Sequence, residues 1–220
     1  STLRDDEWSL KSLHRMILLS STFQMSSEWN QRAEEIDPDN ELIWRMNRRR
    51  LEAEVIRDAL LAVGDNLDRQ LGGSLLPTKN RAYVTSTANI DIRVYDTRRR
   101  SIYLPVVRSA LYAMFQVFDF AEPSVPNGER KSTTLAAQAL FMMNSKVVMD
   151  QSRALAEWIH SHPETSQSGR IRAVYMRLLG RLPESSELGS CLQYMRQYEQ
   201  ALVEAEVQAD ELPLRSWEGL

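Results

Sequence analysis

The stretch "MNRRRLEAEVIRDALLAV" at 46–63 joins three consecutive arginines to apolar residues that recur at helical spacing. In one continuous helix, Arg48 would precede Glu52 by four residues, which is the less favourable order for such a pair. A break near Asn47 leaves the arginines in a connector and places Glu52 in the first turn of a new helix, where negative charge is favourable. The pattern therefore predicts a helix that starts after the arginines and ends near Gly64.

A second run of three arginines occurs in "YDTRRRSIYLPVV" at 95–107, again beside apolar residues. An arginine that is half-buried by its neighbours needs a partner, because an unpaired buried charge is strongly destabilising. Two roles are open for both runs. The side chains can clamp separate segments by binding internal carboxylates and helix carbonyls, or they can converge on a bound anion through bidentate pairs. The clamp is favoured. The candidate residues are Arg48, Arg49, Arg50, Arg98, Arg99 and Arg100.

The residues around 82–107 change from helical spacing to β-branched and aromatic runs. The segments "AYVTS", "IDIRVYD" and "SIYLPVV" are typical of short strands, and Pro105 indicates that the last is an edge strand or a strand that passes into a helix. We therefore expect a small β hairpin or three-stranded patch. It is inserted in a fold that is otherwise mainly α, with about seven helices in one multi-helical domain.

Capping residues mark several of the other helices. Ser9 is an N-cap for a helix over 9–20, and Asp37 followed by Pro38 is a good helix start. In the C-terminal third, Ser145 separates two helices and Gly180 is a helix stop. We expect one domain over 1–220, excised from a larger protein, with an alternative division into 1–130 and 131–220.

Composition excludes several classes of protein. The formal net charge of -3 argues against a protein that coats nucleic acid, and no apolar run is long enough for a membrane helix. Cys191 is the only cysteine, so the chain has no internal disulfide and no thiolate-rich metal site. The first residues do not have the pattern of a signal peptide.

No residue pattern indicates catalysis or a metal. His14 is expected to pack against apolar residues of its helix, and His160 and His162 to be a solvated helix end. Asp37 and its acidic neighbours lack the spacing and the glycine of a calcium loop, so a helix cap is the better interpretation. The sequence also lacks a nucleophile elbow and a phosphate-binding glycine loop. We therefore name no catalytic residue and no metal ligand.

Several blocks of sequence are similar to one family. They include "WSLKSLHRMILLSSTFQMSS", "DPDNELIWRMNRRRLEAEVIRDALLAV", "RRRSIYLPVVRSALYAMFQVFDFAEPS", "STTLAAQALFMMNSKVVMDQSRALA" and "YMRLLGRLPESSEL". Together they resemble the uncharacterised C-terminal domain of planctomycete-type, cytochrome-associated multidomain proteins. The resemblance implies export to an extracytoplasmic place, the periplasm or the cell surface. It also implies an upstream domain that can carry c-type haem, with no cofactor in this fragment. The family has no established catalytic residues to carry over.

These observations lead to two expectations of function. The first is a non-catalytic structural or interaction domain of a larger exported protein, whose partners are the other domains of the same polypeptide. The second is a module of an enzyme that acts on an anionic, for example sulfated, polysaccharide, with the arginines gripping the anion. Binding of nucleic acid is not expected, because aromatic residues are not interleaved with the basic ones.

Overall fold

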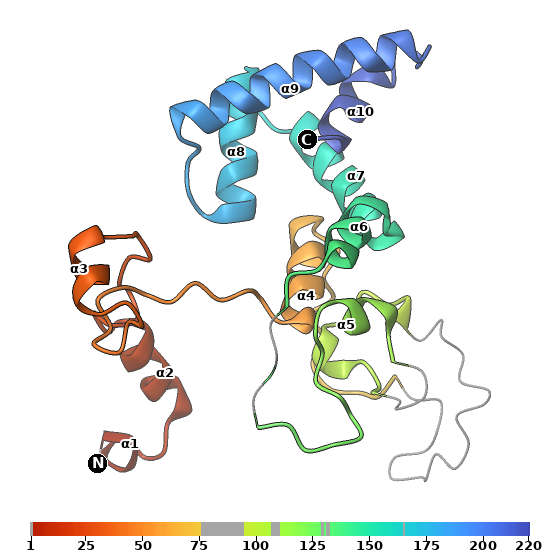
Figure 1. Ribbon diagram of the computed structural model, residues 1–220. Coiled ribbons are helices and arrows are strands. Elements are labelled where there is room, and N and C mark those ends of the chain that lie inside the picture. Colours follow the sequence, from red (N-terminus) through yellow and green to blue (C-terminus); the bar gives the residue numbers. More distant parts are fainter. Residues whose placement is uncertain (1, 76–94, 107–110, 129, 131–132, 165) are drawn as a thin grey trace. The chain divides into compact units, whose positions relative to one another are not determined.

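The structure is a computed structural model that describes residues 2–75, 95–106, 111–128, 130, 133–164 and 166–220. Its described residues are mainly helical, which confirms the predicted fold class (Figure 1). Internal contacts group the chain into two compact units, Ser1–Arg50 and Leu51–Leu220, here called unit 1 and unit 2. The predicted domain 1–220, and its alternative division after residue 130, stay predictions.

Unit 1 contains three short helices, α1 (Thr2–Asp5), α2 (Leu10–Leu18) and α3 (Gln31–Ile36). Ser9 caps α2, since its hydroxyl accepts the N–H of Ser12 at 3.3 Å. This satisfies one of the backbone donors that a helix leaves free at its start. The helix predicted over 9–20 is therefore confirmed.

The segment after α3 is a turn, so the helix predicted to start at Asp37 is wrong. The carboxylate of Asp37 accepts the N–H groups of Glu41 and Leu42 at 2.9 and 2.8 Å. Asn40 follows with a φ of 57°, in the left-handed region that interrupts a helix, and its side-chain oxygen accepts the N–H of Trp44 at 2.9 Å. Local side-chain acceptors thus compete with helix formation and win here.

Burial in unit 1 is unusual, because it involves polar residues. Among its described residues, only Asp37 and Asn40 are buried. Its large apolar side chains are exposed or half-buried. The exposed ones are Trp8, Leu10, Met16, Ile17, Leu18, Leu19, Phe23, Trp29, Ile36, Leu42, Ile43 and Met46. Unit 1 is therefore held by local hydrogen bonds and has no apolar core of its own among these residues.

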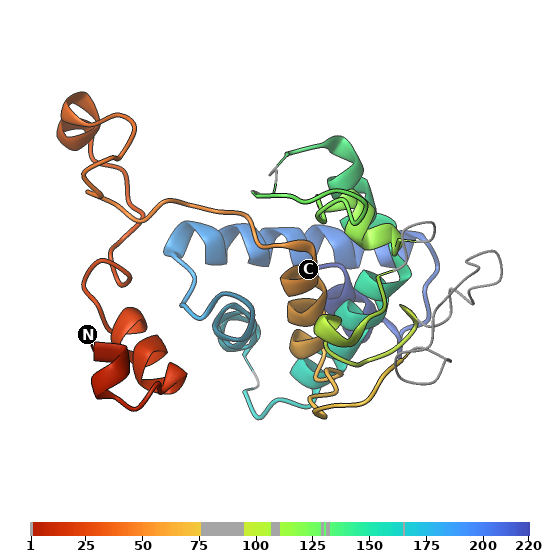
Figure 2. The ribbon, with the colours of Figure 1, turned by 90° about the horizontal axis from the view of Figure 1, so that it is seen from below.

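Unit 2 contains the longer helices. They are α4 (Ala53–Val63), the 3-10 helix η2 (Ser101–Tyr103), α5 (Ala113–Val117), α6 (Ala136–Asn144), α7 (Lys146–His160), α8 (Gln167–Leu179), α9 (Ser185–Glu204) and α10 (Leu212–Glu218). Helix α7 contacts α4, α6, α8 and α10, and α10 also lies against α9 (Figure 2).

The helix boundaries in unit 2 follow the capping residues. Helix α4 begins after the arginines, with Glu52 as its N-cap, and ends at Gly64 as predicted. Ser145 closes α6 and opens α7. Gly180 ends α8 in the left-handed conformation at a φ of 66°, which glycine adopts without steric cost.

The predicted β patch is only partly within the described residues. Residues 76–94, which carry most of the predicted strands, lie outside them. The strand predicted at 101–107 is wrong where it is described, because Ser101–Tyr103 form a 3-10 helix. A single isolated parallel bridge pairs Asp68 with Arg99. Within the described residues, the backbone of Arg99 therefore pairs with the loop after α4.

Two groups of buried side chains form the interior of unit 2. Ala53, Tyr95, Leu104, Met114, Phe115 and Phe118 form a core cluster around the start of α4 and α5. Ala156, Ile159, Ile171, Val174 and Met195 are buried on α7, α8 and α9. Helices α4 and α7 pack together, so the two groups belong to one unit.

Candidate functional site

Arg57 in the middle of α4 is the most buried charged residue among those described, with 1% of its surface exposed. Its Nη1 donates to the carbonyl oxygen of Arg99 at 2.8 Å and to Oγ of Ser101 at 3.3 Å. Its Nη2 donates to the carbonyl oxygen of Thr97. One guanidinium therefore holds the backbone of the second arginine run against α4.

Asp58 completes this attachment. Its Oδ1 accepts the N–H of Ser101 at 2.8 Å and the hydroxyl of Ser101 at 2.7 Å, and lies 3.6 Å from Nη1 of Arg57. Burial lowers the pKa of Arg57, while Tyr112 and Asp58 act in the opposite direction. The net direction is downward, so the nearby groups compensate the buried charge only in part.

Arg99 is the member of the second run that acts as a clamp. Its Nη2 donates to the carbonyl oxygens of Gly72 at 2.5 Å and Gln70 at 3.1 Å, and its Nε lies 3.6 Å from Oδ2 of Asp68. The guanidinium also lies over the ring of Tyr103, 4.4 Å from its centroid. Its hydrogen-bond partners are carbonyls of the loop after α4, whereas the sequence led us to expect carboxylates and helix carbonyls.

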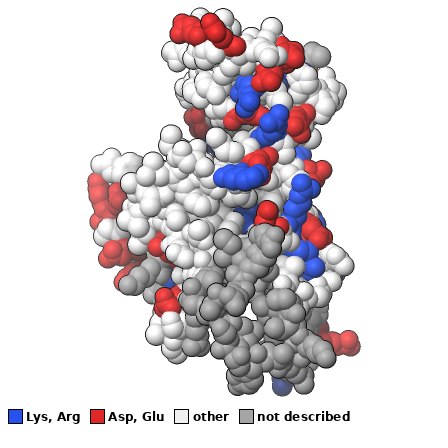
Figure 3. Space-filling model, turned by 90° about the vertical axis from the view of Figure 1, so that its right-hand side faces the viewer, with Lys and Arg blue, Asp and Glu red and all other residues white. Residues whose placement is uncertain are grey.

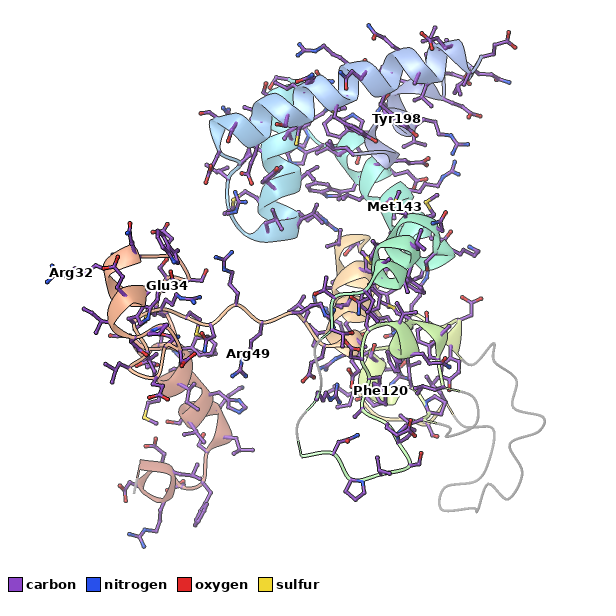
Figure 4. All side chains as sticks on the ribbon, in the orientation of Figure 1. Arg32, Glu34, Arg49, Phe120, Met143 and Tyr198 are labelled. Atoms are coloured by element: carbon purple, nitrogen blue, oxygen red, sulfur yellow. The ribbon has the colours of Figure 1, made fainter. Side chains whose placement is uncertain are left out.

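The other members of the two runs have different environments. Arg98 and Arg100 are exposed, and so are Arg48 and Arg49, while Arg50 is half-buried. The side chain of Arg49 projects from an extended segment at the end of unit 1 (Figure 4). Arg48 and Arg49 make no hydrogen bond or ion pair with described residues. The two runs belong to different units, so their convergence on one anion stays a prediction.

Two further arginines bind the ends of α4. Arg130 forms a bidentate pair with Glu54 in the first turn, at 2.8 and 2.9 Å. Arg177 donates from Nε to the carbonyl oxygen of Val63 in the last turn, at 2.8 Å. The helix dipole favours the carboxylate of Glu54 at the N-terminus and the cation of Arg177 at the C-terminus, and Arg130 contributes by pairing with Glu54. Sequence reasoning missed these two residues and Arg57, because no local pattern marks partners that lie far apart in the chain.

A cleft of about 1130 Å³ lies beside Arg57 in unit 2. Residues from α4, from 95–98, from 111–114 and from α7 line it. Its charged lining is balanced in sign. The cations are Arg57, Arg98, Lys146 and Arg153, and the anions are Asp65, Asp96, Asp150 and Glu157. On the face drawn in Figure 3, the basic side chains of described residues lie in one band with acidic side chains among them, beside a wide uncharged area.

The N-terminus of α7 lies on the wall of this cleft. Ser145, Lys146 and Val147 all line it, and the side chain of Ser145 makes no capping hydrogen bond. The first N–H groups of a helix have no partner within that helix, so they are available to a ligand. Nζ of Lys146 lies 2.6 Å from Oδ2 of Asp150, and this hydrogen bond raises the pKa of Lys146.

The histidines do not join this site. His14 is exposed on α2, so its expected packing against apolar residues is wrong. His160 is exposed at the end of α7, whereas Nδ1 of half-buried His162 accepts the N–H of Glu164 at 3.2 Å. In the described ranges, no group of three or more His, Cys, Asp or Glu side chains is arranged to hold a metal ion. None of the described helices is both long and apolar enough to span a membrane.

Comparison with known proteins identifies the family. A family model described as "PSD1: Protein of unknown function (DUF1553)" matches residues 1–195. The chain therefore belongs to this family, in agreement with its resemblance to an uncharacterised domain. No curated protein and no solved structure matches the chain.

Proposed function

We propose that this PSD1-family chain is a non-catalytic structural and interaction domain of a larger exported, cytochrome-associated protein. The parts of this proposal on export, on an extracytoplasmic location and on a neighbouring c-type cytochrome rest on the sequence resemblance alone. The parts on structure and interaction rest on the two features below.

The exposed apolar surface of unit 1 is the observation that carries the proposal. Leu10 and Leu18 on α2 are 63% and 50% exposed, and Trp29 before α3 is 57% exposed. Contact of large apolar side chains with water is unfavourable, so their number in unit 1 favours cover by another surface. We infer that another part of the same polypeptide covers this surface in the full-length protein.

The arginines support the architectural part of the proposal. Arg57 and Arg99 direct their donors to carbonyl oxygens within unit 2, and Arg130 and Arg177 bind the two ends of α4. A guanidinium with several internal partners is positioned to join segments that are distant in sequence. These side chains therefore maintain the internal structure of unit 2.

Hydrogen exchange of the isolated chain and of the full-length protein tests the interaction. We expect the amides of α2 (Leu10–Leu18) to exchange at least about tenfold more slowly in the full-length protein than in the isolated chain. The covering domain opposes the local opening of α2 that exchange requires. The amides of α9 (Ser185–Glu204) serve as the internal reference. Equal exchange of α2 in the two proteins would contradict the proposal.

The second candidate function is an enzyme module for an anionic polysaccharide, and one observation favours it. Arg98 lines the cleft together with the carboxylates of Asp96 and Asp150, so a basic group and candidate acid or base groups share one cavity. Release of fragments from a sulfated polysaccharide by the full-length protein, lost in Arg98→Ala and retained in Arg100→Ala, would favour the enzyme over the scaffold.

A further inference from the structure

A second groove in unit 2, of about 500 Å³, is lined by residues of α8, α9, α10 and the turn before α10. Helix α9 contacts both α8 and α10, which holds the lining together (Figure 1). Val203 in this lining is 60% exposed, so the groove is open to a partner. The apolar lining residues are Val203, Ala209, Leu212, Pro213 and Trp217.

The segment 199–211 supplies part of this lining and is strongly acidic. It contains five Asp and Glu residues and no Lys or Arg. Two of them, Glu204 and Asp210, directly follow the lining residues Val203 and Ala209. Four of the five carboxylates make no hydrogen bond or ion pair with described residues, namely those of Glu199, Glu204, Glu206 and Asp210.

Arg170 also lines the groove, but its donors have partners. Its Nε donates to the carbonyl oxygen of Glu164 at 2.8 Å, and its Nη2 donates to that of His160 at 3.4 Å. The charges that the lining and the segment 199–211 leave free are therefore negative. An apolar groove with such a border favours a partner that combines cations with an apolar side chain.

The first arginine run has this chemistry. Residues 46–52 form no helix or strand, and Arg48 and Arg49 are exposed without a hydrogen bond or ion pair to described residues. Leu51 follows them and is 55% exposed. This short segment thus presents two free guanidinium groups beside a large apolar side chain, and guanidinium groups pair well with carboxylates.

Two features of one chain thus have free charges of opposite sign. A second copy offers the arginine segment to the groove, so one contact between copies gives partners to both sets of charges. Opposite charges on two surfaces also speed their encounter and exclude contacts between like surfaces.

We propose that the groove of unit 2 binds the segment 46–51 of a second copy of this protein. Leu51 contacts the apolar lining, and Arg48 and Arg49 pair with the free carboxylates of 199–211. The contact joins two different surfaces, so the copies associate head to tail. This inference uses neither α2 nor Trp29, so it does not depend on the proposed function.

Sedimentation equilibrium of the chain over a range of protein concentrations tests the proposal. We expect association that increases with concentration and weakens in about 1 M salt, which screens exposed charges beyond about 3 Å. Arg48→Glu with Arg49→Glu should weaken association at least about tenfold, and so should Glu204→Lys with Glu206→Lys, because each change places like charges opposite one another. Arg98→Glu with Arg100→Glu, from the exposed part of the second run, is the matched control and should associate as the parent does.

Mixing the two charge-reversed proteins separates a specific contact from a general effect of charge. The Glu204→Lys, Glu206→Lys protein keeps the natural arginine segment, and the Arg48→Glu, Arg49→Glu protein keeps the natural groove. An equal mixture should therefore form a one-to-one complex with the affinity of the parent, although neither protein associates with itself. A parent chain that stays monomeric up to about 1 mM, reversed proteins that associate as the parent does, or a mixture without the complex would overturn the proposal.

Discussion

The two runs of three arginines have the same composition and different environments. In unit 1, Arg48 and Arg49 are exposed and make no hydrogen bond or ion pair with described residues. In unit 2, Arg99 binds two carbonyl oxygens, and its backbone carbonyl is in turn held by Arg57. The sequence of a charged run therefore does not determine what its side chains bind. Their binding depends on whether backbone carbonyls and a buried partner lie within reach in the folded structure.

The same contrast extends to the units themselves. Unit 1 buries the polar side chains of Asp37 and Asn40, whose oxygens accept backbone N–H groups of one turn. Unit 2 buries aromatic and aliphatic side chains such as Phe115 and Ile159. Burial of apolar area stabilises a fold much more than a few local hydrogen bonds do. Unit 2 is therefore expected to be the more stable part.

Replacement of Arg57 should have the largest effect on unit 2. In Arg57→Ala, the carbonyls of Thr97 and Arg99 lose their donor, and Asp58 keeps a charge without its cation. Removing one member of a buried ionic group lowers the free energy of unfolding by about 3–5 kcal/mol. Urea denaturation measures this loss. Arg172→Ala on the exposed side of α8 should change it by less than about 0.5 kcal/mol.

Replacement of Arg99 should have the next largest effect, because this side chain is 14% exposed and donates to the carbonyls of Gly72 and Gln70. Loss of these charged hydrogen bonds in Arg99→Ala should lower the free energy of unfolding by about 1.5–3 kcal/mol. Arg100→Ala is the control from the same run. Equal melting temperatures for the two variants would remove the distinction between a clamping and a solvated arginine.

Asp37 tests whether polar burial holds the turn in unit 1. Asp37→Ala removes the acceptor of the N–H groups of Glu41 and Leu42, which should destabilise the turn by about 1–2 kcal/mol. Hydrogen exchange at these two amides should become faster, while the exposed neighbour Asp39, replaced by Ala, should leave it unchanged. Unchanged exchange in Asp37→Ala would show that other contacts hold the turn.

Arg181 is largely exposed but has a bidentate carboxylate partner, so its effect should lie between those of Arg99 and Arg49. Arg181 donates to both carboxylate oxygens of Glu187 at 2.7 Å, and this pair, with the N–H of Glu184, lowers the pKa of Glu187 from 4.5 to about 2. The stabilisation of α9 by Glu187 is complete above pH 4.5 and is lost as the pH falls toward 2.

Carboxyl chemical shifts during an acid titration measure this pKa directly. In Arg181→Ala, the pKa of Glu187 should rise toward its ordinary value, because the main cause of the shift is gone. A pKa for Glu187 that is the same in both proteins would show that Arg181 is not the cause.

Arg49 should show the smallest effect. It is exposed and has no hydrogen-bond or ion-pair partner among the described residues, so Arg49→Ala should change the free energy of unfolding by less than about 0.5 kcal/mol. Thermal unfolding measures the difference from the parent chain. A clear loss of stability would show that the first run is also a clamp, and would remove the contrast with Arg99.

Sequence reasoning predicted the helices whose ends carry local signals. Ser9, Ser145 and Gly180 each mark a helix boundary, since a cap needs only a residue type and its immediate neighbours. It failed after Asp37, where the same acceptor that can cap a helix instead closes a turn with the help of Asn40. An aspartate can cap a helix or close a turn, and the residue types around Asp37 do not show which of the two forms.

The candidate site shows the same division. The second arginine run was named from sequence, and the main partners of Arg99 are carbonyls, which every residue possesses. Because carbonyls leave no mark in the sequence, the partner could not be chosen in advance. Arg57 was not singled out, since a lone arginine on an amphipathic helix normally lies in solvent.

The amino-acid sequence by itself determined that this protein is mainly helical, where α4 and the capped helices end, and that three arginines would follow one another twice. Propensity, caps and spacing act over a few residues and can be read along the chain. Only the tertiary structure decided that Arg57 is buried and that the backbone of Thr97 and Arg99 is its partner. These contacts join residues about 40 positions apart, and packing alone brings such residues together.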